Sequence, residues 1–484
     1  MFDTLTRLGA SGIASAYEIT RSVRFNNNAD DSRFEWTPSG AGNTKVFTFS
    51  CWVKRSMLGV NSQYLIRTDT TFTDRINFDA SDRLEVMCRD TSLLVTTRKF
   101  RDTNAWYHIV CNTNTDNGTA GDRHQIWING VRETAFDTNA NLNGLTIAMN
   151  AAGDHHIGGD GSDGLGGYMA AVHLIDGQQI DASNFAETDA DTGQWIPKKY
   201  TGSYGTNGFF LKFADNSGVT ASTLGKDSSG NGNNFTPQNF SVTAGTGNDS
   251  LEDTPQNNFP TLSPIDHSTN NTFAEGNLVA KGGDNYAAAT FLLPSSGKWY
   301  AEFSKFGNGA TQAVAITRAH QNTAYNGHLG LADMVQYVSN GELGNRTRGD
   351  SSDATAWTND ADALIGVAVD MDNGAVYFAH DNTWQNSGNP TSGASKTGAV
   401  ATDLLTDNHG EHLFSVQGYN GNTSYGMYAN FGQRTLTYTP PAGYQTLCSD
   451  NLPDPTIKIP SDHFDILTYT GNGSTQSITG LSFQ

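Results

Sequence analysis

Apolar and polar residues alternate along much of the chain, with the period of two that half-buried β-strands require. The clearest case is KVFTFSCWVKR, residues 45–55. One face of this stretch collects Phe47, Phe49, Cys51 and Val53, and the other carries Thr48, Ser50, Trp52 and Lys54. The same alternation occurs in AWYHIVCNTN (105–114), HQIWINGVRE (124–133) and GKWYAEFSKF (297–306). The pattern predicts an all-β protein built from antiparallel strands.

A second strand pair is predicted in IGVAVDMDNGAVYFAHDNTW, residues 365–384. If Asn373 and Gly374 form a two-residue hairpin loop, Asp372 pairs with Ala375, and the acids lie on the outer face or in the turn. The alternative is a calcium loop of the EF-hand type. It fits poorly, because Gly374 stands at the fifth position and Asp381, not glutamate, at the twelfth. We therefore interpret the stretch as scaffold.

Interruptions of the alternation define the domain boundaries. Residues 1–20 form an N-terminal arm, and strand-like periodicity begins at SVRF in a first domain over 21–245. The stretch VTAGTGNDSLEDTPQNNFPTLSP loses the alternation and predicts a linker over 246–267. A second domain covers 268–450, and a C-terminal arm covers 451–484.

Composition and charge argue against several classes of function. The chain has 29 basic and 49 acidic residues, a net charge of −20, and 52 glycines. This charge argues against binding to nucleic acid or to anionic membranes, since both need clustered Lys and Arg. The sequence has no signal peptide and no apolar run of about 18 residues, so we expect a soluble protein, made in a cytoplasm and not inserted in a membrane. Its cysteines have neither zinc spacing nor a disulfide framework: Cys51, Cys88, Cys111 and Cys448.

Signatures of catalysis are absent from the sequence. Retaining glucanases on a jelly-roll scaffold need two glutamates a few residues apart around an aspartate, because nucleophile and acid must flank the bond at about 5 Å. The chain has no such pair, and Glu302 in WYAEF stands alone. It also has no G-x-S-x-G, no H-E-x-x-H and no Walker loop. We therefore expect no enzymatic activity.

Two loops offer metal-ligating groups, although no cofactor is certain. His155 and His156 lie near several aspartates, but adjacent residues on a strand point to opposite faces, so a solvated turn is the favoured interpretation. In DSSGNGNNF, hard oxygen ligands surround two glycines, which makes calcium a candidate. The alternative is an Asx-rich turn satisfied by its own backbone. The candidate ligands are Asp227, Asn231 and Asn233.

Large aromatic residues in polar, loop-like stretches are candidates for glycan or receptor contact. Aromatic platforms beside amides and carboxylates serve such contacts, although the same rings also pin loops to a core. The candidates are Trp357, Trp384, Tyr419 and Tyr425. Trp127 and Trp52 are expected to pack within the sandwich.

Three motifs of the second domain, WYAEF, IGVAVDMDNGAVYF followed by Trp, and YANFGQRTLTYTPPAGYQTL, resemble the core strands of a SPRY domain. SVRF, FTFSCWVKR, AWYHIV, IWINGV and GGYMAAVHLIDG resemble a concanavalin A-like jelly roll of the laminin G type. FFLKFADNS and KDSSGNGNNFT resemble the opening of such a domain, but they come at its end, which implies a strand that returns to complete the sandwich. The resemblances imply two antiparallel β-sandwiches with terminal arms, and laminin G-like domains often hold calcium at the rim.

The order of these two domains, with MFDTLTRLGASG and LCSDNLPDPTI, resembles a family of virion-associated proteins of tailed bacteriophages, labelled tail fibre or tail protein. The resemblance implies a non-enzymatic structural protein exposed on the virion. Its partners would be other virion proteins and a host surface glycan or protein. The alternatives are a head-decorating fibre or knob and, in another class, a glycan depolymerase.

The C-terminal arm carries strand-like alternation in SDHFDILTYTG and STQSITGLSFQ, after the second domain is complete. Phe464, Ile466 and Thr468 fall on one side. An apolar strand without a domain of its own must pair with something, because an open edge leaves backbone donors and acceptors unpaired. We expect a homo-oligomer, with a trimer favoured. The N-terminal domain of the same chain is the alternative partner.

Overall fold

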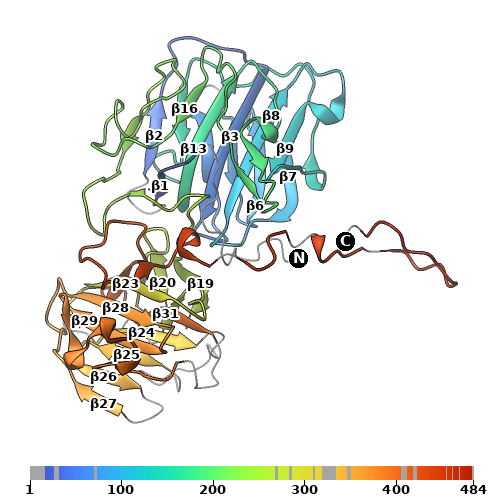
Figure 1. The fold of residues 1–484 in the computed structure, drawn as a ribbon. Helices are drawn as coiled ribbons and strands as arrows, with labels where there is room; N and C mark the ends of the chain where they lie inside the picture. Colours follow the sequence, from blue (N-terminus) through green and yellow to red (C-terminus); the bar gives the residue numbers. More distant parts are fainter. Residues whose placement is uncertain are drawn as a thin grey trace.

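Two β-sandwiches follow one another along the chain, the first at the top of Figure 1 and the second below it. The computed structural model describes residues 17–26, 32–69, 73–267, 271–282, 286–308, 311–318, 334–345, 350–404, 411–417, 422–453, 455–459, 462–467 and 469–481. The predicted all-β class is confirmed. The described helices are short 3₁₀ turns, and none is long and apolar enough to cross a membrane.

The first sandwich consists of two antiparallel sheets. In sheet order, the first contains β10 (Val131–Arg132), β9 (His124–Ile128), β8 (Trp106–Asn114), β3 (Val46–Arg55), β13 (Gly167–Asp176), β1 (Ser22–Phe25) and β18 (Ser250–Leu251), with β16 (Phe209–Leu211) also on β13. The second contains β11 (Phe136–Asn139), β7 (Thr91–Lys99), β6 (Arg83–Cys88), β5 (Arg75–Phe78), β4 (Gln63–Asp69), β12 (Asp154–Ile157), β2 (Arg33–Trp36) and β17 (Thr236–Gln238). Because β16 and β17 pair with β13 and β2, the chain returns after residue 205 to complete both sheets.

Strand β3 shows why the first sheet is so deeply buried. Its inward residues lie in the core between the sheets, as their alternation predicts: Phe47, Phe49, Cys51 and Val53. Its outward residues are buried as well, so the expected half-buried strand is wrong. One reason is a covering segment that includes β14 (Ala186–Thr188), β15 (Trp195–Pro197) and the aromatic rings of Phe185, Trp195, Tyr200 and Tyr204. Lys54, at the end of the outward face, is buried instead by the segment around Asp253. Periodicity along one strand carries no information about such a distant cover.

The second sandwich also has two sheets. One contains β19 (Leu262–His267), β22 (Tyr286–Ala289), β31 (His412–Gln417), β24 (Ala313–Arg318), β25 (Val335–Val338), β26 (Glu342–Asn345) and β27 (Asp350–Asp353). The other contains β20 (Thr272–Ala274), β21 (Val279–Lys281), β32 (Gly426–Asn430), β23 (Lys298–Phe306), β28 (Leu364–Asp370), β29 (Ala375–His380) and β30 (Thr383–Trp384), with β33 (Gln445–Thr446) parallel to β23.

The predicted hairpin exists, with a register that differs by two residues. Asp370 pairs with Ala375, so four residues and not two form the loop between β28 and β29. A shift of two leaves every side chain on its predicted face, and the apolar face lies in the core. The expectation that Asp370 is a surface acid is wrong: it is fully buried, 3.0 Å from the Nζ of Lys298, and it accepts hydrogen bonds from Asn373.

The stretch predicted as a linker is structured chain and not an exposed tether. Residues 250–251 add β18 to the first sandwich, and residues 262–267 form an edge strand of the second. Between them, Asp253 is buried and forms an ion pair of 2.8 Å with Lys54 of β3. Lys54 also donates to Asn258 and to the carbonyl of Phe259, and the indole of Trp106 donates to Asp253, so hydrogen bonds to β3 and β8 hold this polar, turn-rich stretch in place.

Further polar contacts join the two sandwiches directly. Arg24 of β1 forms ion pairs with Asp249 at 2.8 Å and with Glu275 of the second sandwich at 2.6 Å. Tyr168 donates a hydrogen bond of 2.6 Å to the carbonyl of Gly276. Asn277 donates one of 3.0 Å to the carbonyl of Ser56. These buried contacts make the junction a specific interface.

The C-terminal arm extends away from both sandwiches (Figure 1). Its described residues form no strand and are mostly exposed, in contrast to the strand-like alternation of the sequence. The exposed apolar residues of the arm are Ile457, Phe464, Ile466, Leu467, Tyr469, Ile478 and Leu481. Residues 1–16 of the N-terminal arm and Thr468 lie outside the described residues.

Candidate functional site

The outer face of the first sheet carries a polar pocket over β8, β9 and the adjoining loops. Its volume is about 510 Å³. The residues that line it are Asn112, Asn117, Asp122, Gln125, Trp127, Arg132, Gln179, Ile180, Asp181 and Asn184. Outward positions of the strands supply part of the lining, and the loops around η1 (Ala120–Asp122) and η2 (Ala182–Asn184) supply the rest. Trp127 and Ile180 of the lining also pack against the hydrophobic cluster that contains Phe185 and Tyr200 of the cover.

Local sequence explains why these side chains face outward. In HQIWI, Ile126 and Ile128 enter the core, so Gln125 and Trp127 project from the opposite face. In WYHIVCNTN, Cys111 enters the core, so Asn112 projects to the same outer face as Trp127. The register places Asn112 opposite Gln125, which puts two amides side by side in the pocket.

A network of amide hydrogen bonds fixes the pocket. Asn112 donates to the carbonyl of Ile180 at 2.8 Å and to Oε1 of Gln125 at 3.3 Å. Gln179 donates to Oδ1 of Asn112 at 3.2 Å, and Asn117 donates to Oε1 of Gln179 at 3.2 Å. Side chains held in this way lose little further conformational entropy when a ligand binds.

Charged groups at the rim are also held in place. Arg132 donates to Oδ1 of Asp122 at 2.7 Å, and both side chains are about one-third exposed. Asp181 caps η2, where its carboxylate accepts from the backbone and hydroxyl of Ser183 and from the amide of Asn184. The pocket therefore presents fixed donors and fixed acceptors around one aromatic ring.

The prediction that Trp127 packs within the sandwich is wrong. Trp127 is half-buried on the outer face of the sheet and lines the pocket, whereas Trp52 is buried, also on the outer face, beneath the aromatic cover. The signal for Trp127 was present in the sequence, since it alternates with two isoleucines. The amides from the 177–184 segment could not be found in this way, because only the fold brings that segment to β8 and β9.

The four aromatic candidates of the sequence do not form one exposed platform. Trp357 is fully buried in the second core against Tyr337, which favours the alternative that this ring pins its loop to the core. Trp384 is half-buried against the aromatic cluster under η4 (Pro390–Ser395), and the ring of Tyr425 packs over Gly307. Tyr419 lies outside the described residues.

The DSSGNGNNF loop has the geometry of a self-satisfied turn. Both carboxylate oxygens of Asp227 accept hydrogen bonds, from the backbone of Phe210, Ser229 and Asn233 and from the hydroxyl of Ser229. Asn231 and Asn233 donate their amides to backbone carbonyls between residues 205 and 208. This arrangement favours the Asx-turn alternative over a calcium site.

His155 and His156 do not lie in a solvated turn. Both are buried in β12, because that strand is paired on each side, with β2 and β4. His155 bonds to the carbonyls of Gly153 and Met149, and His156 lies 3.9 Å from a carboxylate oxygen of Glu35 on the neighbouring strand. Their separate partners agree with the expectation that adjacent strand residues share no ligand.

Glu302, the isolated glutamate, has a structural position. It is buried, and its carboxylate accepts hydrogen bonds from the backbone of Thr437 and Tyr438 at 2.8 Å each. The hydroxyl of Tyr300 lies 3.3 Å away. These bonds hold the 437–438 loop against β23.

A model of the concanavalin A-like lectin/glucanases superfamily matches residues 28–182. The first sandwich has a concanavalin A-like fold. The match covers both strands of the pocket and most of its lining loops. Curated protein sequences contain no significant match to the chain.

Several solved structures are similar to parts of the chain, all at low TM-scores. A pentraxin from Limulus polyphemus is 15% identical and covers 33% of this chain and 78% of its own, with a TM-score of 0.26. The SPRY domain of human HERC1 is 15% identical and covers 38% and 99%, with a TM-score of 0.25. A putative carbohydrate binding protein from Bacteroides ovatus is 16% identical and covers 46% and 58%, with a TM-score of 0.31.

Proposed function

We propose that this chain is a non-enzymatic adhesion protein that binds a surface glycan in the Trp127 pocket of its concanavalin A-like sandwich. The observation that carries the proposal is the lining of the pocket: one tryptophan, a set of fixed amides and an Arg–Asp pair. A sugar presents apolar C–H groups that pack on an aromatic ring. Its hydroxyls both donate and accept, as amides do. The lining matches both properties.

The polar character of the pocket favours a glycan over an apolar ligand. Both N–H groups of Asn112 and of Gln179 already donate within the network, so these two amides form a rigid polar wall, and each oxygen keeps one further acceptor position for a ligand. A site built to hydrogen-bond hydroxyls discriminates strongly against a ligand that lacks them, since its polar groups would then be unpaired. We therefore expect selectivity among sugars by the position of their hydroxyls.

The same pocket favours binding over hydrolysis. A glycosidase acid needs a carboxyl in apolar surroundings, so that it keeps its proton. Asp122 is bonded to Arg132, and Asp181 is an exposed cap of η2. Neither carboxylate has the surroundings of a general acid, which supports a non-catalytic role.

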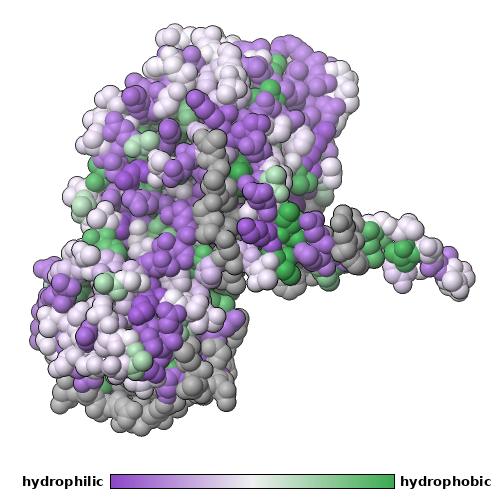
Figure 2. Space-filling model, in the orientation of Figure 1, coloured by the Kyte–Doolittle hydropathy of each residue, from purple (hydrophilic) through white to green (hydrophobic). Residues whose placement is uncertain are grey.

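We place this adhesion protein on the virion of a tailed bacteriophage, in a tail fibre or spike. The support is the sequence resemblance described above, and a head-decorating fibre is the alternative setting. We also propose that the chain forms a homo-oligomer, with a trimer favoured, through its C-terminal arm. Hydrophobic residues lie along the projecting arm in Figure 2, and water exposure of so many apolar side chains is costly unless a second copy covers them.

Glycan-array binding tests the proposed function. Full-length protein and the variant Trp127→Ala are applied to an array of bacterial surface oligosaccharides. We expect the protein to retain a defined subset of glycans and the variant to lose that subset. Absence of any retained glycan, or an unchanged pattern for Trp127→Ala, would refute the proposal.

Trp384→Ala is the matched control. It removes a half-buried tryptophan of the second sandwich, outside the pocket, and should leave the array pattern unchanged. Loss of binding in this variant would move the glycan site to the second sandwich. Incubation of the wild type with the retained polysaccharide, followed by measurement of reducing ends, tests for a depolymerase; new reducing ends would contradict the non-enzymatic proposal.

A further inference from the structure

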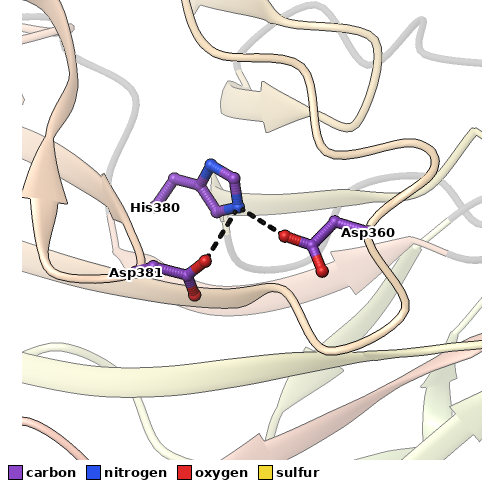
Figure 3. Close-up of side chains that lie close together, drawn as sticks. All are labelled: Asp360, His380 and Asp381. Carbon is purple, nitrogen blue, oxygen red and sulfur yellow. Dashed lines mark hydrogen bonds and ion pairs between the residues drawn. The ribbon is translucent and has the colours of Figure 1, made fainter.

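Three potential metal ligands converge at one side of the second sandwich, in a place that the proposed glycan site does not involve. His380 is the last residue of β29, and Asp381 is the next residue, in the tight turn before β30. Asp360 comes from the loop that precedes β28. Figure 3 shows both carboxylates directed toward the same nitrogen of the imidazole.

The distances within this cluster fit a shared cation better than two hydrogen bonds. Nε2 of His380 lies 3.3 Å from Oδ2 of Asp360 and 3.4 Å from Oδ2 of Asp381. A charge-assisted N–H···O bond is about 2.7–2.9 Å long, and one nitrogen carries only one proton. Ligand atoms at about 2.0–2.1 Å from a tetrahedral metal are separated by about 3.3–3.4 Å. The two separations from His380 match that tetrahedral edge, and the ligand atoms of all three residues lie within 4.8 Å of one another.

The second oxygen of each carboxylate is already fixed by the backbone. Oδ1 of Asp360 accepts from the N–H of Asp362 at 3.1 Å, and Oδ1 of Asp381 accepts from the N–H of Leu364 at 3.0 Å. Hydrogen bonds of this kind orient metal ligands, and their loss typically lowers metal affinity by about 10–100-fold. Each aspartate thus has its Oδ2 positioned near Nε2 of His380 and available to a metal ion.

We propose that Asp360, His380 and Asp381 bind a divalent transition-metal ion, with zinc as the best match. Imidazole favours zinc and similar metals over calcium, which takes oxygen ligands at longer distances. Two carboxylates and a neutral histidine balance the charge of a divalent ion. Both carboxylates are partly exposed, at 40% and 47%, so water can complete the coordination sphere.

The bound ion would act as a cross-link within the second sandwich. It joins the loop before β28 to the turn after β29. These segments also meet at Leu364, whose carbonyl accepts from the N–H of Asp381 and whose N–H donates to Oδ1 of Asp381. Because the ligands come together only in the folded chain, binding stabilises the folded state by mass action. The proposal therefore predicts a metal-dependent melting temperature.

Titration of the full-length chain with metal tests the proposal. The protein is stripped with a chelator, dialysed and titrated with Zn²⁺ by calorimetry, and with Co²⁺ by visible absorption. We expect one ion per chain, a cobalt spectrum of four-coordinate type and a rise in melting temperature on addition of Zn²⁺. Asp381→Asn should weaken Zn²⁺ binding by more than about 10-fold, the lower end of what loss of even an outer-shell partner costs.

Asp362→Asn is the matched control, because it removes an exposed carboxylate two residues from Asp360 and keeps the backbone N–H that orients it. It should bind Zn²⁺ as the wild type does. Circular dichroism of the metal-free variants establishes that each is folded. Equal affinity in the wild type and in folded Asp381→Asn would overturn the proposal, as would the absence of saturable binding by the wild type.

Discussion

Replacement of Lys54 by methionine removes one charge from an ion pair that the fold encloses completely. The Nζ of Lys54 donates to Oδ2 of Asp253 at 2.8 Å, to Asn258 at 2.8 Å and to the carbonyl of Phe259 at 2.7 Å. Both side chains of the pair are at most 1% exposed. Burial lowers the pKa of Lys54, and the nearby Asp253 opposes this shift. The methionine keeps the aliphatic length of the side chain and leaves Asp253 with an uncompensated charge.

The contacts of Asp253 determine how much unfolding free energy Lys54→Met should lose. Removal of one partner of a buried pair costs about 3–5 kcal/mol. Oδ1 of Asp253 retains bonds from the indole of Trp106 at 3.0 Å and from the backbone of Phe259 at 3.3 Å, which partly compensate its charge. We therefore expect a loss near the lower limit, about 3 kcal/mol.

Lys45→Met is the matched control. Lys45 forms an ion pair of 2.9 Å with Asp116, but the two side chains are 40% and 53% exposed. A solvated pair of this kind contributes only about 0–1 kcal/mol. Both substitutions therefore remove a lysine ammonium from an ion pair. They differ in whether that ion pair is buried or exposed.

Urea-induced unfolding measures both effects, with the midpoint shift converted by the slope of the wild-type transition. We expect Lys54→Met to lose at least about 2 kcal/mol more than Lys45→Met. Equal losses would refute the conclusion that the 249–262 segment is an integral, buried part of the junction between the sandwiches.

Three further predictions concern pH, the hairpin and the arm. Burial lowers the pKa of His108 and of His173 to about 3, so the unfolded chain takes up protons below about pH 6.5 that the folded chain does not. The free energy of unfolding should therefore fall between pH 6.5 and pH 3, by up to about 1.4 kcal/mol per pH unit for each histidine. Urea titrations at several pH values measure this dependence. A His108→Gln/His173→Gln variant with the same pH dependence as the wild type would contradict the assignment. Gly374→Val places a valine at a φ of 70° and should lower the free energy of unfolding by about 1–3 kcal/mol. Asp370→Asn should lower it by about 1–2 kcal/mol, because that acid is buried and ion-paired. An unchanged free energy of unfolding for either variant would contradict the hairpin description. Deletion of 458–484 should reduce the mass measured by light scattering to that of a folded monomer, and an unchanged mass would exclude the arm as the oligomer contact.

Local periodicity predicted the strands that form the two cores. It succeeded for β3, β8, β9, β28 and β29, because the alternation of each strand records which side faces the core. It did not determine the register of the β28–β29 hairpin. A loop of two residues and one of four give the same faces, so the pattern cannot separate them.

Features that depend on contacts between distant segments were not predictable in this way. The outer face of β3 is buried by a cover some 130 residues later in the chain, as the bond from Thr48 to the carbonyl of Gln178 illustrates. Asp253 appears in a stretch with linker composition, and only the position of Lys54 explains its burial. The acid at position 360 likewise meets His380 only through the pairing of β28 with β29.

The pocket contains one residue whose position the sequence predicts and others whose positions it does not. The outward position of Trp127 follows from its alternation with isoleucines, so the sequence contained that signal. Gln179 and Asn117 reach the same pocket through loops whose paths depend on the whole sandwich. Polar residues in loops have no periodicity, and their convergence on one site therefore required the structure.

Calorimetric titration with the best oligosaccharide from the array tests the central claim most directly. The wild type should bind one oligosaccharide per chain with a saturable heat, and Trp127→Ala should give no measurable binding at the same concentrations while remaining folded by circular dichroism. Saturable binding of equal affinity by Trp127→Ala would contradict the account, because the glycan would then be held somewhere other than the Trp127 pocket.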